Sequence, residues 1–187
     1  SSSHPGMLRI ATSGAPFERG LAQAREVRER AEPYWWNTLE QLATRLGEPS
    51  VHAVLERTAE DVANWTDQME AEHPSGVEEC KGLAEGLGFT AQEYFTAMFS
   101  YRYSLDADMG NRQCTLVATA DSDGAPLLGK TDDIGEDQLG MNVMEVCRPD
   151  SGLAHVGFHF AGTIFTVAGM NERGLAMGMT GIPGAVV

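Results

Sequence analysis

A single cysteine, Cys114, stands where the residue pattern of the chain changes. The sequence up to Gln113 is rich in glutamate and alanine, with apolar residues at helical spacing, whereas valine, threonine and glycine dominate after it. A thiol at such a junction is a candidate nucleophile. At its ordinary pKa a cysteine is only slightly ionised at neutral pH, so Cys114 needs a base.

Cleavage of the Gln113–Cys114 bond would supply that base. The thiol would attack the carbonyl carbon of Gln113 and form a thioester, which water would then hydrolyse. The freed α-amine of Cys114, with an ordinary pKa of about 8, would accept the thiol proton in later reactions. We therefore name Gln113 and Cys114 as a candidate cleavage site and Cys114 as a candidate catalytic residue.

Four polar residues, Lys130 to Asp133, lie at the end of the next predicted strand and just after it. A hairpin turn at residues 121–124 would bring them back beside Cys114. Asp133 or Asp132 would then hold the α-amine, while Lys130 would bind an anionic group or lower the pKa of the thiol. The simpler interpretation stays open: the aspartates end a strand, Lys130 lies along the surface, and Cys114 is buried and inert.

A metal hydrolase is a weaker interpretation of the same region. His155 and His159 are four residues apart on one predicted strand, so they share a face, and the Asp132/Asp133 pair would add carboxylate ligands. Histidines in an apolar strand are more often packed or edge residues. The first interpretation needs no metal and no other cofactor.

The elements that must position these residues divide the chain into a helical and a stranded part. We predict helices over residues 17–32, 34–46, 50–72, 76–86 and 91–105, with Pro33 kinking or ending the first. Capping boxes are predicted at Ser75–Glu78 and Thr90–Glu93. A short edge strand is predicted at 8–11. Six further strands, expected to pair antiparallel, are predicted at 114–120, 126–131, 142–148, 154–160, 163–168 and 174–180.

Composition restricts the class of protein. The length of 187 residues and the ordinary apolar content of 42% fit one domain with a proper core. A net charge of −14 argues against binding nucleic acid or an anionic membrane surface, and no apolar run approaches the length of a membrane span. The odd, sparse set of three cysteines favours a reducing compartment, so we expect a cytoplasmic protein.

Four stretches carry a resemblance to a known family. They are Gly14–Gly20 (GAPFERG), Glu79–Gly86 (ECKGLAEG), the Cys114–Asp133 segment with its LGKTDD ending, and Ala168–Ala176 (AGMNERGLA). In order and spacing they resemble the acyl-CoA:6-aminopenicillanic acid acyltransferase family, peptidase family C45. Its members are N-terminal-nucleophile (Ntn) hydrolases.

The resemblance implies an α+β fold, the αββα sandwich of Ntn hydrolases. Residues 1–113 would be the helical pro-segment or α-subunit part, and 114–187 the β-rich start of the β-subunit, together forming one domain. Cys114 would be the nucleophile of both self-cleavage and turnover. The family's aspartate falls on Asp133, or on Asp132 if the register slips by one, and its substrate-binding positions fall on Lys130 and Thr131.

The function implied is that of an acyltransferase or amide hydrolase that works through a Cys114 thioester. Its partner would be a small-molecule amide or an acyl donor such as an acyl-CoA. Because family members are longer, we expect the sandwich to be incomplete at its C-terminal side. The alternative is therefore an uncleaved or truncated, non-catalytic Ntn-like interaction module, whose open sheet edge pairs with a C-terminal remainder chain or a second copy.

Overall fold

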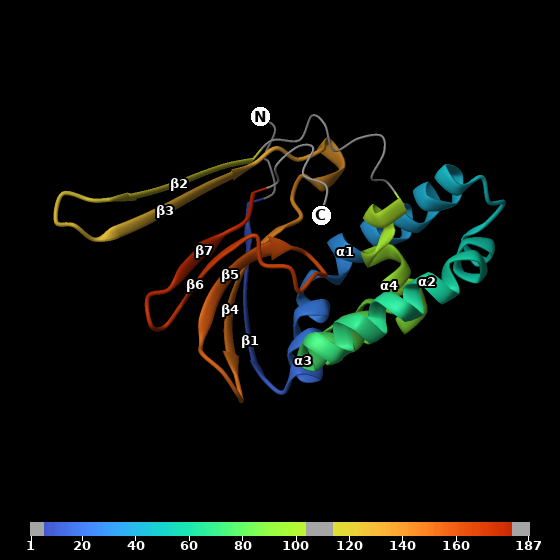
Figure 1. Ribbon diagram of the computed structural model, residues 1–187, viewed down its shortest axis with the longest axis horizontal. Helices are drawn as coiled ribbons and strands as arrows, with labels where there is room; N and C mark the ends of the chain where they lie inside the picture. The colour runs from blue at the N-terminus through green and yellow to red at the C-terminus, as the bar shows by residue number, and fades with distance from the viewer. Residues whose placement is uncertain (1–5, 104–113, 181–187) are drawn as a thin grey trace.

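The computed structural model describes residues 6–103 and 114–180 and has an α+β fold. Its helices gather on one side of a five-stranded sheet, and a two-stranded hairpin extends away from that sheet (Figure 1). Among the residues described, no helix combines the length and the apolar character that crossing a membrane requires.

Four α-helices form the N-terminal part: α1 (Pro16–Leu46), α2 (Val51–Glu72), α3 (Pro74–Leu87) and α4 (Ala91–Met98). Local signals explain several of their ends. The Ser50 side chain accepts the N–H of Ala53 at the start of α2, and Thr90 and Glu93 form the predicted capping box of α4. The predicted capping box at Ser75 is wrong, because α3 already begins at Pro74 and has no side-chain cap.

Of the two outcomes predicted for Pro33, a kink or an end of the first helix, the end does not occur, because α1 continues from Pro16 to Leu46. An interior proline costs a helix about 3 kcal/mol. Tertiary packing offsets that cost: Trp35 and Leu39 follow the proline and are buried in the same core as Ala31 before it. The Trp35 indole also donates a hydrogen bond to the Ala161 carbonyl across 3.3 Å.

The fourth helix is shorter than predicted. It ends at Met98 and is followed by a 3₁₀ turn, η1 (Ser100–Tyr103). Residues 104 and 105, to which the prediction extended, lie outside the described residues.

Five strands form the main sheet in the order β1-β4-β5-β6-β7. They are β1 (Leu8–Gly14), β4 (Asn142–Pro149), β5 (His155–Phe160), β6 (Ala168–Asn171) and β7 (Ala176–Gly178). β4 to β7 pair antiparallel as predicted, and β1 is an edge strand as predicted. The pairing of β1 with β4 is parallel, because the helices between them return the chain to the same end of the sheet.

The predicted strand at 163–168 is wrong in its position. Residues 163–167 are irregular, and the strand that pairs with β5 begins at Ala168. In the irregular segment, Thr163 donates its hydroxyl proton to the Phe160 carbonyl, 3.1 Å away, and its own carbonyl accepts from Gln23. Side-chain hydrogen bonds of this kind replace the strand ladder.

Helices α1 and α3 pack unusually closely, and glycines permit it. A Cβ atom added to Gly82 would lie 2.1 Å from the Phe17 carbonyl oxygen, and one added to Gly20 would lie 2.0 Å from that of Glu79. Both glycines belong to the first two motifs of the family resemblance. The glycines of these two motifs are therefore explained by packing, because they allow the backbones of α1 and α3 to approach closely.

Candidate active site

The hairpin that carries Cys114 is formed by β2 (Cys114–Ala120) and β3 (Pro126–Asp132). Its turn is held by Asp121, whose carboxylate accepts the N–H groups of Asp123 and Ala125, each at 2.9 Å. Gly124 takes the left-handed conformation with φ of 83°. The predicted hairpin is thus confirmed, and its register places Cys114 directly opposite Asp132.

One carboxylate contacts both the thiol and the lysine of the predicted site. The Cys114 thiol donates to Asp132 Oδ1 across 3.3 Å, and Lys130 Nζ forms an ion pair with the same oxygen. Only 5% of the Lys130 side chain is exposed. The structure therefore brings three of the predicted residues together as one group, with Asp132 between the nucleophile and a nearly buried cation.

The pleat of the hairpin separates Thr131 from this group. Thr131 pairs with Thr115 and is exposed on the opposite face, because neighbouring residues of a strand point to opposite sides. Asp133 follows the end of β3 and is exposed. Asp132, rather than Asp133, is the carboxylate that contacts the thiol. Gln113 lies outside the described residues.

A pocket of about 370 Å³ lies beside the group and is lined by Lys130 and Asp132. Its other walls come mostly from apolar side chains of the hairpin, the main sheet and the N-terminal segment: Met7, Leu128, Ile134, Phe158, Val167 and Ala168, with Asn142 and His159. Pockets of this size and character accept small organic molecules. The arrangement can hold an apolar acyl group next to the Lys130–Asp132 pair.

Cys114 is the most accessible of the three cysteines, which are all free thiols. Cys80 and Cys147 are buried, whereas Cys114 is half-buried. Burial raises the pKa of Cys80 to about 12 and also raises that of Cys147, because a thiolate is disfavoured away from water. Exposure therefore singles out Cys114 as the candidate nucleophile.

The two histidines considered as metal ligands are engaged elsewhere. His159 Nε2 lies 2.9 Å from Glu145 Oε2, and its Nδ1 lies 3.0 Å from the Phe160 carbonyl oxygen. His155 Nδ1 lies 3.0 Å from the Leu153 carbonyl. Within the described residues, no group of three or more His, Cys, Asp or Glu side chains is placed to hold a metal ion.

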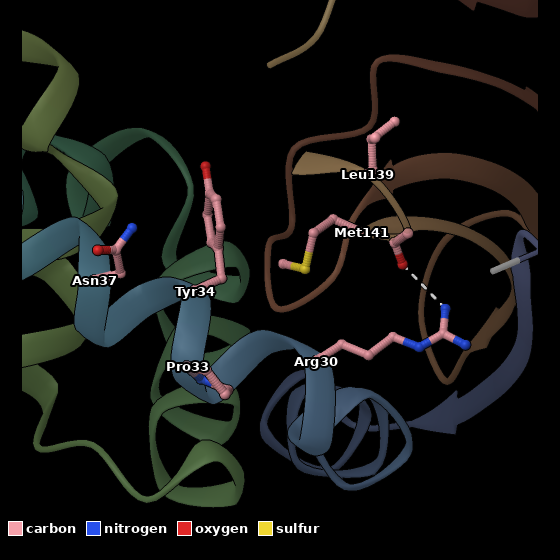
Figure 2. Close-up of a pocket in the computed structure, with 7 residues that line it drawn as sticks. Arg30, Pro33, Tyr34, Asn37, Leu139 and Met141 are labelled. Carbon is pink, nitrogen blue, oxygen red and sulfur yellow. Dashed lines mark hydrogen bonds between the residues drawn. The ribbon is translucent and has the colours of Figure 1, made fainter. Parts of the chain in front are cut away.

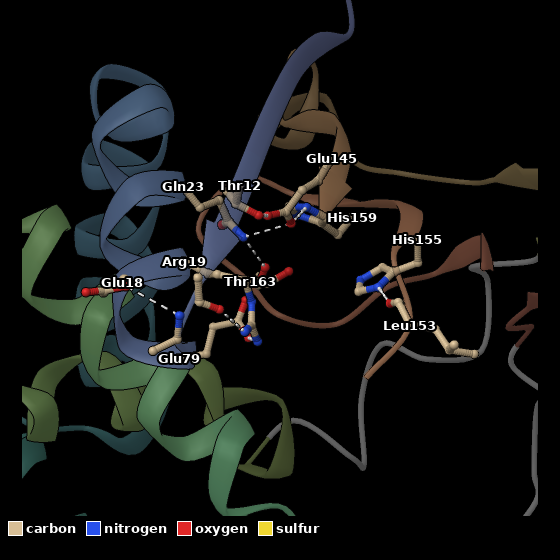
Figure 3. A network of polar contacts seen from close by, with 12 residues as sticks. Thr12, Glu18, Arg19, Gln23, Glu79, Glu145, Leu153, His155, His159 and Thr163 are labelled. Carbon is tan, nitrogen blue, oxygen red and sulfur yellow. Dashed lines mark hydrogen bonds and ion pairs between the residues drawn. The ribbon is translucent and has the colours of Figure 1, made fainter. Parts of the chain in front are cut away.

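A buried polar network beneath the sheet was not predicted from the sequence (Figure 3). Glu145 on β4 is hydrogen-bonded by Thr12 from β1, by His159 from β5 and by Gln23 from α1. Gln23 also donates to the carbonyl of Thr163. The available signal was a glutamate with two apolar residues on either side of it in a predicted strand, and its partners are too distant in sequence to be recognised.

Hydrogen bonding and burial act in opposite directions on the carboxylates of this region. Burial raises the pKa of Glu145, but hydrogen bonds from His159 and Thr12 and the charge of His159 outweigh it, so the net shift is downward. For Glu79, burial is the larger effect and raises the pKa despite the ion pair with Arg19.

No family model matches the chain, and no curated protein matches it significantly. The family resemblance therefore rests on the four sequence motifs alone.

Proposed function

We propose that the protein is an autoproteolytic Ntn-type enzyme that cleaves an amide or transfers an acyl group through a thioester on Cys114. The observation that carries the proposal is the group formed by Cys114, Asp132 and Lys130 beside an apolar pocket. It joins a half-buried thiol to a charged pair, and that pair lines a space for a small organic substrate.

Maturation is the first step of the proposed chemistry. The Cys114 sulfur attacks the carbonyl carbon of Gln113, the C–N bond breaks, and the nitrogen takes up a proton to become the α-amine of Cys114. Water then hydrolyses the thioester, which leaves a carboxylate on Gln113 and a free thiol on Cys114. Asp132, whose Oδ1 lies 3.3 Å from the thiol sulfur, would accept a hydrogen bond from the new α-amine and orient it.

Turnover repeats the same chemistry on a substrate. The α-amine takes the thiol proton, the thiolate attacks the carbonyl of an amide or thioester, and the leaving amine or thiol departs with a proton. The acyl group then remains on Cys114 until water or an acceptor amine removes it. Lys130 forms an ion pair with Asp132, and the apolar walls of the pocket hold the acyl group.

The αββα sandwich belongs to this proposal. The helices cover one face of the main sheet (Figure 1), while the half-exposed side chains of Val156 and Phe158 alternate along β5 with the buried Gly157 and His159 and so lie on the other face. In an Ntn sandwich this face packs on a second sheet. The β2–β3 hairpin already lies next to β7, where the Leu116 side chain contacts the backbone of Gly178. A cytoplasmic location, which the odd and sparse set of cysteines in the sequence favours, is part of the same proposal.

The reaction of Cys114 with an acyl donor tests the proposal. The purified chain is incubated with a small acyl thioester, such as butyryl-N-acetylcysteamine, and its mass is measured after digestion. We expect a butyryl group on the peptide that contains Cys114, and none on that region in a Cys114→Ala variant. Cys80 and Cys147 serve as internal controls for unspecific acylation. Equal labelling of all three cysteines, or no labelling, would contradict the proposal.

A non-catalytic interaction module is the second candidate, and a specific observation favours it. The outward face of the hairpin exposes 53% of Val117 and 51% of Leu127, and Leu175 beside β6 is 70% exposed. Exposed apolar side chains in such number mark contact surfaces. This candidate predicts stable association with a second polypeptide by a chain whose Gln113–Cys114 bond stays intact and whose thiol is not acylated.

A further inference from the structure

Two pockets outside the candidate active site differ in how their polar groups are arranged. One lies between α1 and the segment that leads into β4, and in it the Arg30 guanidinium and the Tyr34 hydroxyl are at opposite ends (Figure 2). These two groups therefore cannot hold the same group of a ligand. The other pocket has a volume of about 450 Å³ and lies where α2 and α3 meet the sheet. Helix α3 joins its polar and apolar walls.

Glu79 of α3 presents an open carboxylate oxygen to this second pocket. Its Oε2 forms an ion pair with a terminal guanidinium nitrogen of Arg19, and this pair lies beside the Glu145 network (Figure 3). Among the described residues, no hydrogen bond reaches the other oxygen, Oε1. Burial raises the pKa of Glu79 despite the neighbouring Arg19, so the protein compensates this carboxylate only in part. A cationic hydrogen-bond donor in the pocket would complete its bonding.

Arg19 does not turn the pocket into an anion site, because its guanidinium is engaged by the protein. Its second terminal nitrogen donates to the Gly14 carbonyl across 3.0 Å, and its Nε is buried. A second carboxylate, that of Glu145, also lines the pocket. With the lining histidines His73 and His155 neutral, the lining side chains carry two negative charges and one positive charge. This balance favours a cation over an anion.

An apolar wall lies one helical turn from Glu79. Gly76 precedes Glu79 by three residues on α3, so the two positions are neighbours on one face of the helix. A Cβ atom added to Gly76 would lie 3.3 Å from Ile164 Cδ1 and 3.5 Å from Met69 Cε, so both side chains meet at this glycine. Phe165, the next residue after Ile164, also lines the pocket. The carboxylate and the apolar wall are therefore close enough to contact one small molecule.

We infer that this pocket binds an organic primary amine, in its ammonium form, that has an apolar body. The ammonium group donates to Glu79 Oε1, and the body of the ligand lies against Ile164, Met69 and Phe165. The site does not include Cys114, and the inference does not depend on the proposed function.

Calorimetric titration with 4-phenylbutylamine at pH 8, where histidines are neutral, tests the inference. The matched neutral and anionic probes are 4-phenylbutanol and 4-phenylbutyrate. We expect saturable binding of the amine, and binding of the alcohol and the acid at least about tenfold weaker. A Glu79→Gln variant should lose at least about tenfold in affinity for the amine. Glu85→Gln, at an exposed position of the same helix, should change it by less than about twofold.

The Glu85 control separates the pocket from the charge of the whole chain. Each of the two variants removes one negative charge from a chain of net charge −14, so a general attraction of cations would weaken equally in both. Equal losses in Glu79→Gln and Glu85→Gln would therefore overturn the inference. The same holds if the amine shows no saturable binding below about 10 mM.

A second pair of variants keeps the test decisive if Glu79→Gln does not fold. Met179 lines the pocket and is 55% exposed, so Met179→Lys places an ammonium group there, while Met179→Gln has a similar length without the charge. We expect Met179→Lys to weaken binding of the amine by at least about fivefold relative to Met179→Gln. Equal affinities in this pair would show that the amine binds elsewhere.

Discussion

Asp132 is the residue on which the geometry of the candidate active site depends. It accepts the Cys114 thiol and pairs with Lys130, whose ammonium group is nearly buried. A buried charge that loses its partner is strongly destabilising, because no water replaces the lost contact. Asp132 therefore has two roles: it neutralises the charge of Lys130, and it contacts the thiol of the candidate nucleophile.

Replacing Asp132 by asparagine should affect both roles. We expect Asp132→Asn to lower the free energy of unfolding by about 2 kcal/mol, since Lys130 loses its counter-charge. Acylation of Cys114 should slow by at least about tenfold. Urea unfolding and the thioester assay measure the two effects. Asp123→Asn at the exposed hairpin tip is the matched control; if it behaves like Asp132→Asn, the role given to Asp132 is wrong.

Glu145 makes the stability of the fold depend on pH. Its pKa lies below the ordinary value of 4.5, so the folded state favours the ionised form. The stabilisation is fully present above that ordinary value and is lost as the pH falls through the lower, folded-state pKa. Glu79, whose pKa is raised, contributes with the opposite sign in the neighbouring range.

A Glu145→Gln variant separates the two carboxylates. The difference in unfolding free energy between wild type and variant should be largest near pH 6 and should shrink as the pH falls from about 4.5 towards 3. The Glu79 contribution cancels in this difference because both proteins contain it. Urea unfolding of both proteins across this range measures it. A difference that is constant, or that grows towards low pH, would contradict the account of the network.

The sequence allowed part of the site to be predicted at this scale. The two predicted strands and the turn signal between them were enough to place Lys130 and one aspartate beside Cys114. It did not decide between Asp132 and Asp133, and it did not separate Thr131 from the group, because a shift of one residue moves a side chain to the other face of a strand. The network around Glu145 depends on contacts between residues far apart in sequence, which no local pattern records.

At the scale of elements, the pair α1–α3 supports the face of the sheet that carries the network. Gly20 and Gly82 allow the two helices to approach until backbone meets backbone. Arg19 and Glu79, neighbours of this contact, form an ion pair between the same helices. The closeness of the helices thus positions the polar groups below β4.

Gly82→Ala should disturb this contact severely. The added methyl group would lie 2.1 Å from the Phe17 carbonyl oxygen, so the helices must separate. We expect a loss of about 3 kcal/mol in unfolding free energy. Gly129→Ala on β3, where a methyl group meets open space, should change it by less than about 1 kcal/mol. Thermal or urea unfolding compares the two, and equal effects would show that α1 and α3 are not packed as described.

The elements themselves were largely predictable where the signal is local. Helix ends at His73–Pro74 and Thr90 and the turn at Asp121–Gly124 follow from capping and turn chemistry. The continuous α1 through Pro33 and the irregular segment at 163–167 were not, because tertiary packing and side-chain hydrogen bonds outweigh local preference there.

At the scale of the whole molecule, the helical layer and the sheet agree with the predicted α+β order, helices first and strands after. One face of the sheet is covered by the helices, and the hairpin extends from the molecule with apolar side chains exposed. This arrangement is compatible with both candidate functions. The two candidates make different predictions about one covalent bond: the Ntn-type enzyme cleaves the bond between Gln113 and Cys114, and the interaction module keeps it intact.

The mass of the intact, denatured chain tests that difference most directly, with a Cys114→Ala variant beside it. Our account predicts two fragments divided at Gln113/Cys114 in the wild type, the second beginning with a free cysteine, and a single uncut mass in the variant. A single uncut mass in both proteins, even after prolonged incubation, would contradict autoproteolysis and favour the interaction module. Cutting in both would show that Cys114 is not the residue responsible.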